Sequence, residues 1–430
     1  MFGFPINSQV NIEQFSNYAD SGFPKIQQRE VFYSVKDGNW DNSTTWQTAS
    51  GRVGIIPTQY DDVYIRHALI NSTSISTNSF YCNNLHISEN GSLYFSVIGG
   101  GSSFVYVYGN LILNGILNMS SRVGHKIYLY GNNNIINKTP ISVVGSGFVY
   151  AGTNQKIVDI YYDYLGIINP GIKTPLNDII CGQLEISNSA TLDMLWYNFT
   201  SNGQATFAGN AVSPGYFIAN YGNYILVKGF ASFPYGITTA KNGTIFEFQN
   251  GITSTDRNIR SAWDLTNTTF KFTTNNQSFT SGVNGYIYAN DVIIDNNIEF
   301  TINSANGLYL TGTINGLNAS SKLTHKGVLV FETQNSAENS MTTGIWDFTT
   351  TANTILYSGN YSATIPSYFT TFHNLTISGT GTKTLGVNTT LNGNLSISGT
   401  LQLSSYDFSI TGTTSISGSS LLKNGAGNVV

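Results

Sequence analysis

The stretches GNLILNGILNM at Gly109–Met119 and GNLSISGTLQL at Gly393–Leu403 decide the fold, because they repeat one pattern at two distant places in the chain. Apolar residues fall at every second position in both, and Gly115 and Gly399 interrupt the alternation at the same point. A period of two buries one face of a strand, and glycine permits a tight turn. Both stretches therefore predict pairs of short strands whose inward residues are Leu111, Leu113, Leu117, Met119, Leu395, Ile397, Leu401 and Leu403.

The similarity extends beyond these strands. A looser copy lies at Leu308–Leu317, and SRVGHK at Ser121–Lys126 resembles SKLTHK at Ser321–Lys326. LGIINPGIKT at Leu165–Thr174 likewise resembles LTISGTGTKT at Leu375–Thr384. Self-similarity of this kind is typical of repeat architectures, so we expect a duplicated unit.

The repeats also predict the organisation of the chain. The duplicated unit covers approximately residues 105–194 and 305–403, with a divergent stretch between them. We expect four parts: an N-terminal attachment arm at 1–30, a paired-Trp cap with the first coils at 31–104, a first β-solenoid unit with the divergent stretch at 105–304, and a second, possibly truncated, unit at 305–430.

The composition indicates an all-β protein. Only 10% of the 430 residues are charged, whereas the chain holds 50 Asn, 44 Gly, 26 Tyr and 25 Phe. Asn and Gly shape turns and break helices, and aromatic residues favour strands. The aromatic content argues against disorder, and the 19 Lys and Arg form no basic stripe for nucleic acid. No apolar run approaches the length of a membrane-spanning helix, so we expect no membrane insertion.

Short strands separated by Gly, Asn and Ser turns over hundreds of residues fit two architectures. A parallel β-helix, or β-solenoid, needs an inward row of apolar residues in every coil and accepts Asn at its turns. An array of β-sandwich domains is the alternative, because Asn-Gly pairs such as Asn114-Gly115 and Asn250-Gly251 are typical of antiparallel hairpins. The solenoid fits the spacing better.

A paired-tryptophan segment carries a resemblance to a known group. Gly38–Trp46 holds Trp40 and Trp46, and it is followed by Ile56-Pro57-Thr58 and then by Asp61-Asp62-Val63-Tyr64-Ile65. This arrangement, together with the repeats after Leu375, resembles the β-helical surface and fibre proteins of Bacteroidota and their phages. The resemblance implies a fold and a biological setting but no catalytic residue. We expect the two tryptophans to cap the first coil, with ligand stacking as the alternative.

Cysteines and the N-terminus bear on cofactors and location. Cys82 and Cys181 lie about a hundred residues apart without metal-binding spacing, so we expect two buried free thiols, no metal and no cofactor. The sequence after Met1 has no basic region, apolar core or cleavage site of a signal peptide. If Met1 is the true start, we expect no export by the general secretory route.

Catalytic residues are not indicated. Asp291, Asp295 and Glu299 share parity, but on one strand neighbours would lie about 13 Å apart, too far for a glycosidase pair. Asp159 with Asp163, or Asp178 with Glu185, would need adjacent coils to bring them together. His125 and His325 recur at matching positions of the repeat, which favours a structural role.

Aromatic clusters are the best candidates for recognition. Tyr161, Tyr162 and Tyr164, and the pair Trp196 and Tyr197, place neighbouring rings on opposite faces of a strand, so at least one ring of each cluster should point outward. Exposed Tyr and Trp suit stacking on sugars or contact with another subunit. The alternative is that these rings fill wide corners of the coils.

Three classes of function remain. The first is a structural phage appendage, a fibre or spike, attached to other virion proteins by its N-terminal arm and presenting its solenoid to a host-surface glycan or protein. Such fibres are commonly homotrimers, assembled in the host cytoplasm, and this expectation rests on fold analogy. A secreted adhesin and a polysaccharide depolymerase are the alternatives; the missing signal peptide disfavours the adhesin. We expect a non-enzymatic virion protein.

Overall fold

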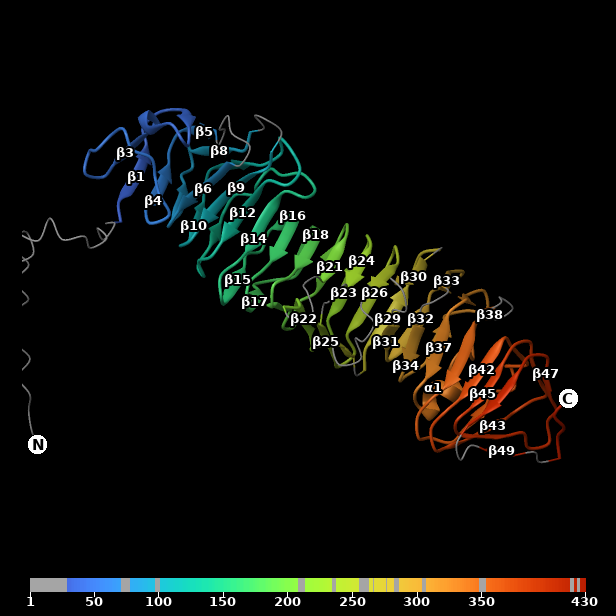
Figure 1. The fold of residues 1–430 in the computed structure, drawn as a ribbon. Helices are drawn as coiled ribbons and strands as arrows, with labels where there is room; N and C mark the ends of the chain where they lie inside the picture. Colours follow the sequence, from blue (N-terminus) through green and yellow to red (C-terminus); the bar gives the residue numbers. More distant parts are fainter. Residues whose placement is uncertain are drawn as a thin grey trace, which may run out of the picture.

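Short strands alternate with turns along the chain, and strands of successive coils pair in parallel, whereas β1 and β3 pair antiparallel. The computed structural model is a β-solenoid of about 14 turns, with 49% strand and 3% helix. Figure 1 shows a long, narrow body in which successive coils run from β1 to β47. The all-β solenoid prediction is confirmed, and the β-sandwich alternative is wrong. The structure describes residues 29–70, 78–96, 101–207, 213–233, 237–254, 263–265, 267–275, 277–281, 286–303, 307–347, 353–417, 421–423 and 426–430.

The first coils form two narrow sheets and the start of a long one. One narrow sheet contains β1 (Val31–Ser34), β3 (Trp46–Thr48), β4 (Asp62–Ile65), β7 (Leu85–Ile87), β10 (Leu111–Leu113) and β13 (Ile135–Ile136). The other contains β2 (Gly38–Asn39), β5 (Ala68–Ile70), β8 (Ser92–Tyr94) and β11 (Ile116–Asn118). The long sheet begins with β6 (Asn78–Cys82), β9 (Ser103–Val107), β12 (Lys126–Leu129), β14 (Gly147–Tyr150), β16 (Tyr161–Ile167) and β18 (Ile179–Ile186).

Beyond β18 the long sheet continues as two rows. Strand β18 pairs with both β20 and β21, so one long strand is followed by two short ones in the next coil. The first row is β20 (Phe199–Ser201), β23 (Tyr224–Val227), β26 (Ile245–Phe248), β29 (Thr269–Phe272), β32 (Asp291–Ile294) and β35 (Ile314–Gly316). The second is β21 (Ala205–Phe207), β24 (Ala231–Phe233), β27 (Ile252–Ser254), β30 (Gln277–Ser281), β33 (Glu299–Ile302), β36 (Lys322–His325) and β38 (Ile345–Asp347).

Four further sheets complete the solenoid. The first is β15 (Gln155–Ile157), β17 (Gly171–Pro175), β19 (Ala190–Asp193), β22 (Tyr216–Ala219), β25 (Ile237–Ala240) and β28 (Trp263–Asp264). The second is β31 (Tyr286–Ala289), β34 (Gly307–Leu310), β37 (Val328–Phe331), β39 (Thr354–Tyr357), β42 (Asn374–Ile377), β45 (Leu395–Ile397) and β48 (Thr414–Ile416). The last two are β40 (Ala363–Ile365), β43 (Thr382–Leu385), β46 (Thr400–Gln402) and β49 (Leu421–Lys423), and β41 (Thr371–Phe372), β44 (Thr389–Leu391) and β47 (Phe408–Ile410). Helix α1 (Gln334–Asn339) and a 3-10 turn at Ser43–Thr45 interrupt the coils.

The core is built from inward rows, one residue per coil. Val63, Leu85 and Leu111 occupy the same position on β4, β7 and β10, and all three are buried. The prediction of inward residues is confirmed, because all eight are buried: Leu111, Leu113, Leu117, Met119, Leu395, Ile397, Leu401 and Leu403. Within the described residues, no helix is long and apolar enough to cross a membrane.

Asparagine side chains link the turns of successive coils. Asn84 Oδ1 accepts the backbone N–H of Asn110 at 2.7 Å, and Asn110 Oδ1 accepts that of Asn133 at 2.9 Å. Near the other end, Asn374 Oδ1 accepts the backbone N–H of Asn394 at 2.8 Å. A turn leaves backbone donors outside the sheet ladders, and these amides satisfy them. The high Asn content therefore has a structural use.

Two lysines from matching repeat segments are buried in the same way. Lys173 of β17 donates from Nζ to the backbone oxygens of Ile168 and Asn169, at 2.9 and 2.7 Å. Lys383 of β43 donates to the Tyr361 oxygen at 2.5 Å. Burial lowers the pKa of each lysine to about 8. Each ammonium thus holds a turn closed through carbonyl oxygens.

The division of the chain into four parts stays a prediction. The predicted boundary after residue 104 falls within β9, and the one at 304 lies outside the described residues. The predicted attachment arm, residues 1–30, falls almost wholly outside the described residues, which begin at Arg29.

Candidate functional site

The two tryptophans predicted as a cap lie together inside the N-terminal end of the solenoid. Their rings meet edge to face, with centroids 5.4 Å apart, and Trp40 also packs against Phe80 of β6. Trp46 Nε1 donates to the Trp40 backbone oxygen at 2.6 Å. Both side chains are buried, which favours the capping role over ligand stacking.

The predicted tyrosine cluster on β16 is divided between the two faces of the strand. Tyr161 is exposed, whereas Tyr162 is buried with its hydroxyl 2.8 Å from that of Tyr150. Tyr164 is buried beneath Lys126, whose Nζ lies 3.7 Å from the ring centroid, and it donates to Glu185 at 2.7 Å. The expectation that one ring points outward therefore holds, and only Tyr161 offers a free surface.

Trp196 and Tyr197 lie in a turn between β19 and β20, so the prediction that they share a strand is wrong. The left-handed backbone of Leu195, with φ of 50°, reverses the chain at this point. Trp196 is 65% exposed, whereas Tyr197 is half-buried against the core. Tyr221 of the next coil meets Trp196 edge to face at 6.4 Å. These residues form an exposed aromatic corner separate from Tyr161.

A larger aromatic surface covers the outward face of β6, β9 and β12. Tyr81, Tyr106 and Tyr128 stack in register, with centroid distances of 5.1 and 4.6 Å and interplanar angles of 15° and 11°. Tyr108 and Tyr130 stack beside them at 5.0 Å and 22°. We call these two sets the first and second tyrosine rows. Figure 1 shows β6, β9 and β12 as consecutive strands near the N-terminal end.

Both tyrosine rows begin beside an open hollow. Tyr81 heads the first row and lines a hollow of ≈ 370 Å³ with Pro57, Thr58, Gln59 and Tyr60. Tyr108 heads the second row and lines a hollow of ≈ 440 Å³ with Arg29, Gln59, Tyr60 and Asn83. Gln59 and Tyr60 belong to both linings, so the hollows are neighbours. We call this region, with its eight lining residues, the row-head site.

Two adjacent aspartates fix the walls of the row-head site. Asp61 accepts hydrogen bonds from the backbone N and Oγ1 of Thr58, at 2.8 and 2.7 Å, and so holds the turn that carries Gln59 and Tyr60. Asp62 accepts from Arg29 Nη2 at 2.6 Å and from Asn83 Nδ2 at 2.9 Å. The Asp-Asp pair that follows the paired-tryptophan segment therefore fixes the turn and the side chains that line the row-head site.

The row-head site was missed in the sequence, although the rows leave a trace there. FVYVY ends at Tyr108 and KIYLY ends at Tyr130, so two strands carry Tyr at alternate positions. Alternation predicts that these tyrosines share a face. It does not predict their stacking, because that depends on the register between coils. Burial raises the pKa of Tyr128 to about 12, so its hydroxyl remains a neutral donor.

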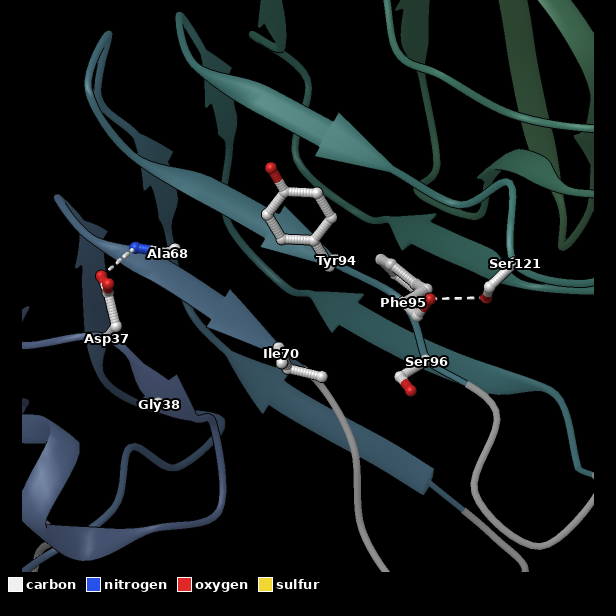
Figure 2. Close-up of a pocket in the computed structure, with 8 residues that line it drawn as sticks. All are labelled: Asp37, Gly38, Ala68, Ile70, Tyr94, Phe95, Ser96 and Ser121. Carbon is white, nitrogen blue, oxygen red and sulfur yellow. Dashed lines mark hydrogen bonds between the residues drawn. The ribbon is translucent and has the colours of Figure 1, made fainter.

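Another open hollow, of ≈ 510 Å³, lies beside β5 and β8. Figure 2 shows two of its polar groups in hydrogen bonds: Asp37 accepts from the Ala68 backbone N–H at 2.8 Å, and Ser121 donates to the Phe95 backbone oxygen at 2.5 Å. Its remaining lining includes Ile70 and Tyr94, and the lining surface is mainly apolar.

Ser121 also lies 2.9 Å from His125 Nε2, the spacing of a nucleophile and its base. The remaining contacts oppose that role. His125 Nδ1 accepts the Ser103 backbone N–H at 3.0 Å, so the neutral ring carries its proton on Nε2 and donates it to Ser121. The Ser121 hydroxyl proton is directed to Phe95 O. This pair is a structural link between coils, as expected for the repeated histidines; His325 is likewise fully buried.

The acidic residues considered for catalysis are engaged in hydrogen bonds or ion pairs. Asp291 starts β32 and Glu299 starts β33, so they do not share a strand. Asp291 accepts from Thr313 at 2.7 Å, and Glu299 pairs with Lys322 at 3.3 Å. Asp295 pairs with Lys271 at 3.2 Å. A hydrogen bond from Thr324, together with Lys322, lowers the pKa of Glu299, which is opposite to the shift that a general acid needs.

The other acidic residues considered for catalysis also accept hydrogen bonds. Asp163 accepts from Ser142 at 2.5 Å, and Asp159 accepts from Asn177 at 3.0 Å. Asp178 accepts from the Asn198 backbone N–H at 2.8 Å. These bonds join turns of neighbouring coils.

Cys82 and Cys181 are free and buried, as predicted. Burial raises the pKa of Cys181 to about 12, which disfavours the reactive thiolate. In the part of the chain that the structure describes, His, Cys, Asp and Glu form no group of three or more suited to a metal ion.

Comparison with models of protein families, with curated proteins and with solved structures finds no match to this chain. The geometry of its own surface therefore carries the functional proposal.

Proposed function

We propose that this protein is a non-enzymatic component of a phage appendage, a fibre or spike, that binds a host-surface glycan. The observation that carries the binding proposal is the pair of outward tyrosine rows, which end beside two adjoining hollows. Outward aromatic residues beside polar side chains are suited to sugars, because a sugar ring has an apolar face and polar edges. The elongated solenoid is compatible with a shaft that carries this surface.

The proposal extends the expectations from the sequence to the whole particle. Residues 1–30 attach the chain to other virion proteins, and three copies assemble into the appendage. Trp196 and Tyr161 are further exposed rings that contact either the glycan or a neighbouring copy. The location in the virion rests on the resemblance of the Trp40 and Trp46 segment and of the repeats.

Three measurements test this function. Mass spectrometry of purified phage particles should detect the chain, and its absence from the particles would contradict the virion role. Light scattering during size-exclusion chromatography should give three times the chain mass. Incubation with host polysaccharide should release no oligosaccharides; release that is lost in a carboxylate variant would establish an enzyme instead.

A further inference from the structure

The stacked rings of each tyrosine row cover one another, which restricts where a ligand can stack. In the first row Tyr106 lies between Tyr81 and Tyr128, so both of its faces are in contact with a ring. The surface of the row presents ring edges and hydroxyls. A flat ligand can meet a ring face only where a row ends.

The first row ends at Tyr81. Among the described residues, Tyr106 is the one ring that stacks on Tyr81, and the Tyr81 residue is 41% exposed. Pro57, Gln59 and Tyr60 line the adjoining hollow together with Tyr81, so a ligand in the hollow contacts this ring. Among the described residues, no second ring stacks on the face of Tyr81 opposite Tyr106, so that face can accept a ligand ring.

The second row is headed by Tyr108, which lies one coil later than Tyr81. The strand register pairs Cys82 with Val107, so the row position before Tyr108 belongs to Asn83. A short amide there leaves Tyr108 41% exposed. Because Tyr106 and Tyr108 are two residues apart on one strand, the two row heads are offset by about 7 Å along the strands and about 4.8 Å along the solenoid axis.

The polar groups around these heads determine the chemistry of the ligand. Gln59 supplies a neutral amide at the rim, and Asn83 supplies its Oδ1 as an acceptor, because Asn83 Nδ2 already donates to Asp62. Among the described residues, Arg29 is the only charged one that lines the two hollows, and Asp62 balances it through bonds of 3.0 and 2.6 Å. A site without uncompensated charge favours a neutral ligand over an anionic one.

We propose that the row-head site binds two linked, uncharged pyranose rings, one stacked on Tyr81 and the other on Tyr108. The hydroxyls of the sugars face Gln59 and Asn83, and Tyr60 covers the pair between the two hollows. This inference rests on the proposed glycan-binding function and assigns its site and ligand class.

The test is calorimetric titration of the full chain with defined hexasaccharides. The neutral probes are β-1,4-linked glucose, mannose and N-acetylglucosamine, and the acidic probe is a galacturonic acid hexasaccharide. We expect binding of at least one neutral probe. Tyr81→Ala should weaken it by about tenfold or more, because the stacking face is lost, whereas Tyr81→Phe should bind nearly as well as the wild type.

Tyr368→Ala is the matched control, because Tyr368 is also an exposed tyrosine but belongs neither to the tyrosine rows nor to the lining of the row-head site. Its affinity for the hexasaccharide should lie within about twofold of the wild-type value, a much smaller change than the tenfold loss expected for Tyr81→Ala. Circular dichroism of each variant verifies that the solenoid is retained. A destabilised Tyr81→Ala is replaced by Gln59→Ala, which lies at the surface of the same hollows and should also weaken binding.

The results of these titrations distinguish failure of the row-head site from failure of the proposed glycan-binding function. Binding that is unaffected by Tyr81→Ala and Gln59→Ala overturns the row-head site, while the proposed glycan-binding function stands. Preference for the acidic probe overturns the neutral ligand class. Failure of all four probes to bind overturns the inference; if host cells then bind the full chain through a protein, the glycan-binding function fails as well.

Discussion

Asp61 holds Thr58 by two hydrogen bonds, one of 2.8 Å from the backbone N–H and one of 2.7 Å from Oγ1. The same carboxylate accepts the Glu30 backbone N–H at 3.0 Å. Thr58 and Asp61 enclose Gln59 and Tyr60, so this contact orders two walls of the row-head site.

Replacement of Asp61 should therefore affect both stability and binding. Asp61 is buried, and Asp61→Ala leaves its donors without an acceptor, which should lower the free energy of unfolding by about 1–3 kcal/mol. Urea denaturation measures this change, and calorimetry should show weaker glycan binding. Asp61→Asn, which keeps one acceptor oxygen, should lose less. Equal stability and affinity of Asp61→Ala and the wild type would refute the role of this contact.

Truncation of a core side chain in the repeat should leave a cavity and lower the free energy of unfolding. Leu395 is buried on β45, and Leu395→Ala should lower the free energy of unfolding by about 2–5 kcal/mol. The neighbouring Ser396 points outward, so Ser396→Ala should change it by less than about 0.5 kcal/mol. Thermal or urea denaturation compares the pair. Similar losses in both variants would mean that the alternation does not define the core.

The buried lysines should make stability depend on alkaline pH. The pKa of Lys173 is about 8 in the folded chain, against an ordinary value of 10.5. Between these values the unfolded chain binds more protons at this side chain, so the contribution of Lys173 to the free energy of unfolding rises with pH. Thiols and tyrosines also titrate at alkaline pH, so urea denaturation of the wild type is compared with that of Lys173→Met between pH 8 and 9.5. The free energy of unfolding should rise less, or fall more, with pH in the variant, and identical slopes would argue against a buried ammonium.

The buried His325 should make the folded chain less stable as the pH falls. Burial lowers the pKa of His325 to about 3, against an ordinary value of 6.5. As pH falls below 6.5, this histidine binds a proton in the unfolded chain but stays neutral in the folded chain. The free energy of unfolding therefore decreases. Between pH 6.5 and 5 this loss should be about 1.5 kcal/mol. His325→Leu should reduce this loss relative to the wild type. The same pH dependence of stability in the variant and the wild type would contradict the assignment.

The sequence predicted the solenoid because its signal is local. Alternation at Gly109–Met119 depends only on which residues face inward, and the inward set is buried as expected. The outward side was harder to predict. Tyr162 and Tyr164 were candidates for recognition, but both are buried, Tyr162 against Tyr150 and Tyr164 beneath Lys126.

The row-head site depends on contacts between distant segments. Tyr60 and Tyr81 line one hollow because the turn held by Asp61 passes beside β6. The stacking of Tyr106 on Tyr81 needs the register between coils. Neither relation follows from residue type or periodicity within one strand.

The most direct measurement is a crystal structure of the full chain bound to the neutral hexasaccharide with the highest affinity. The account predicts two adjacent sugar rings in the row-head site, one stacked on Tyr81 and the next on Tyr108, with hydroxyls facing Gln59 and Asn83. Sugar bound only elsewhere, for example over Trp196 and Tyr221, would contradict it.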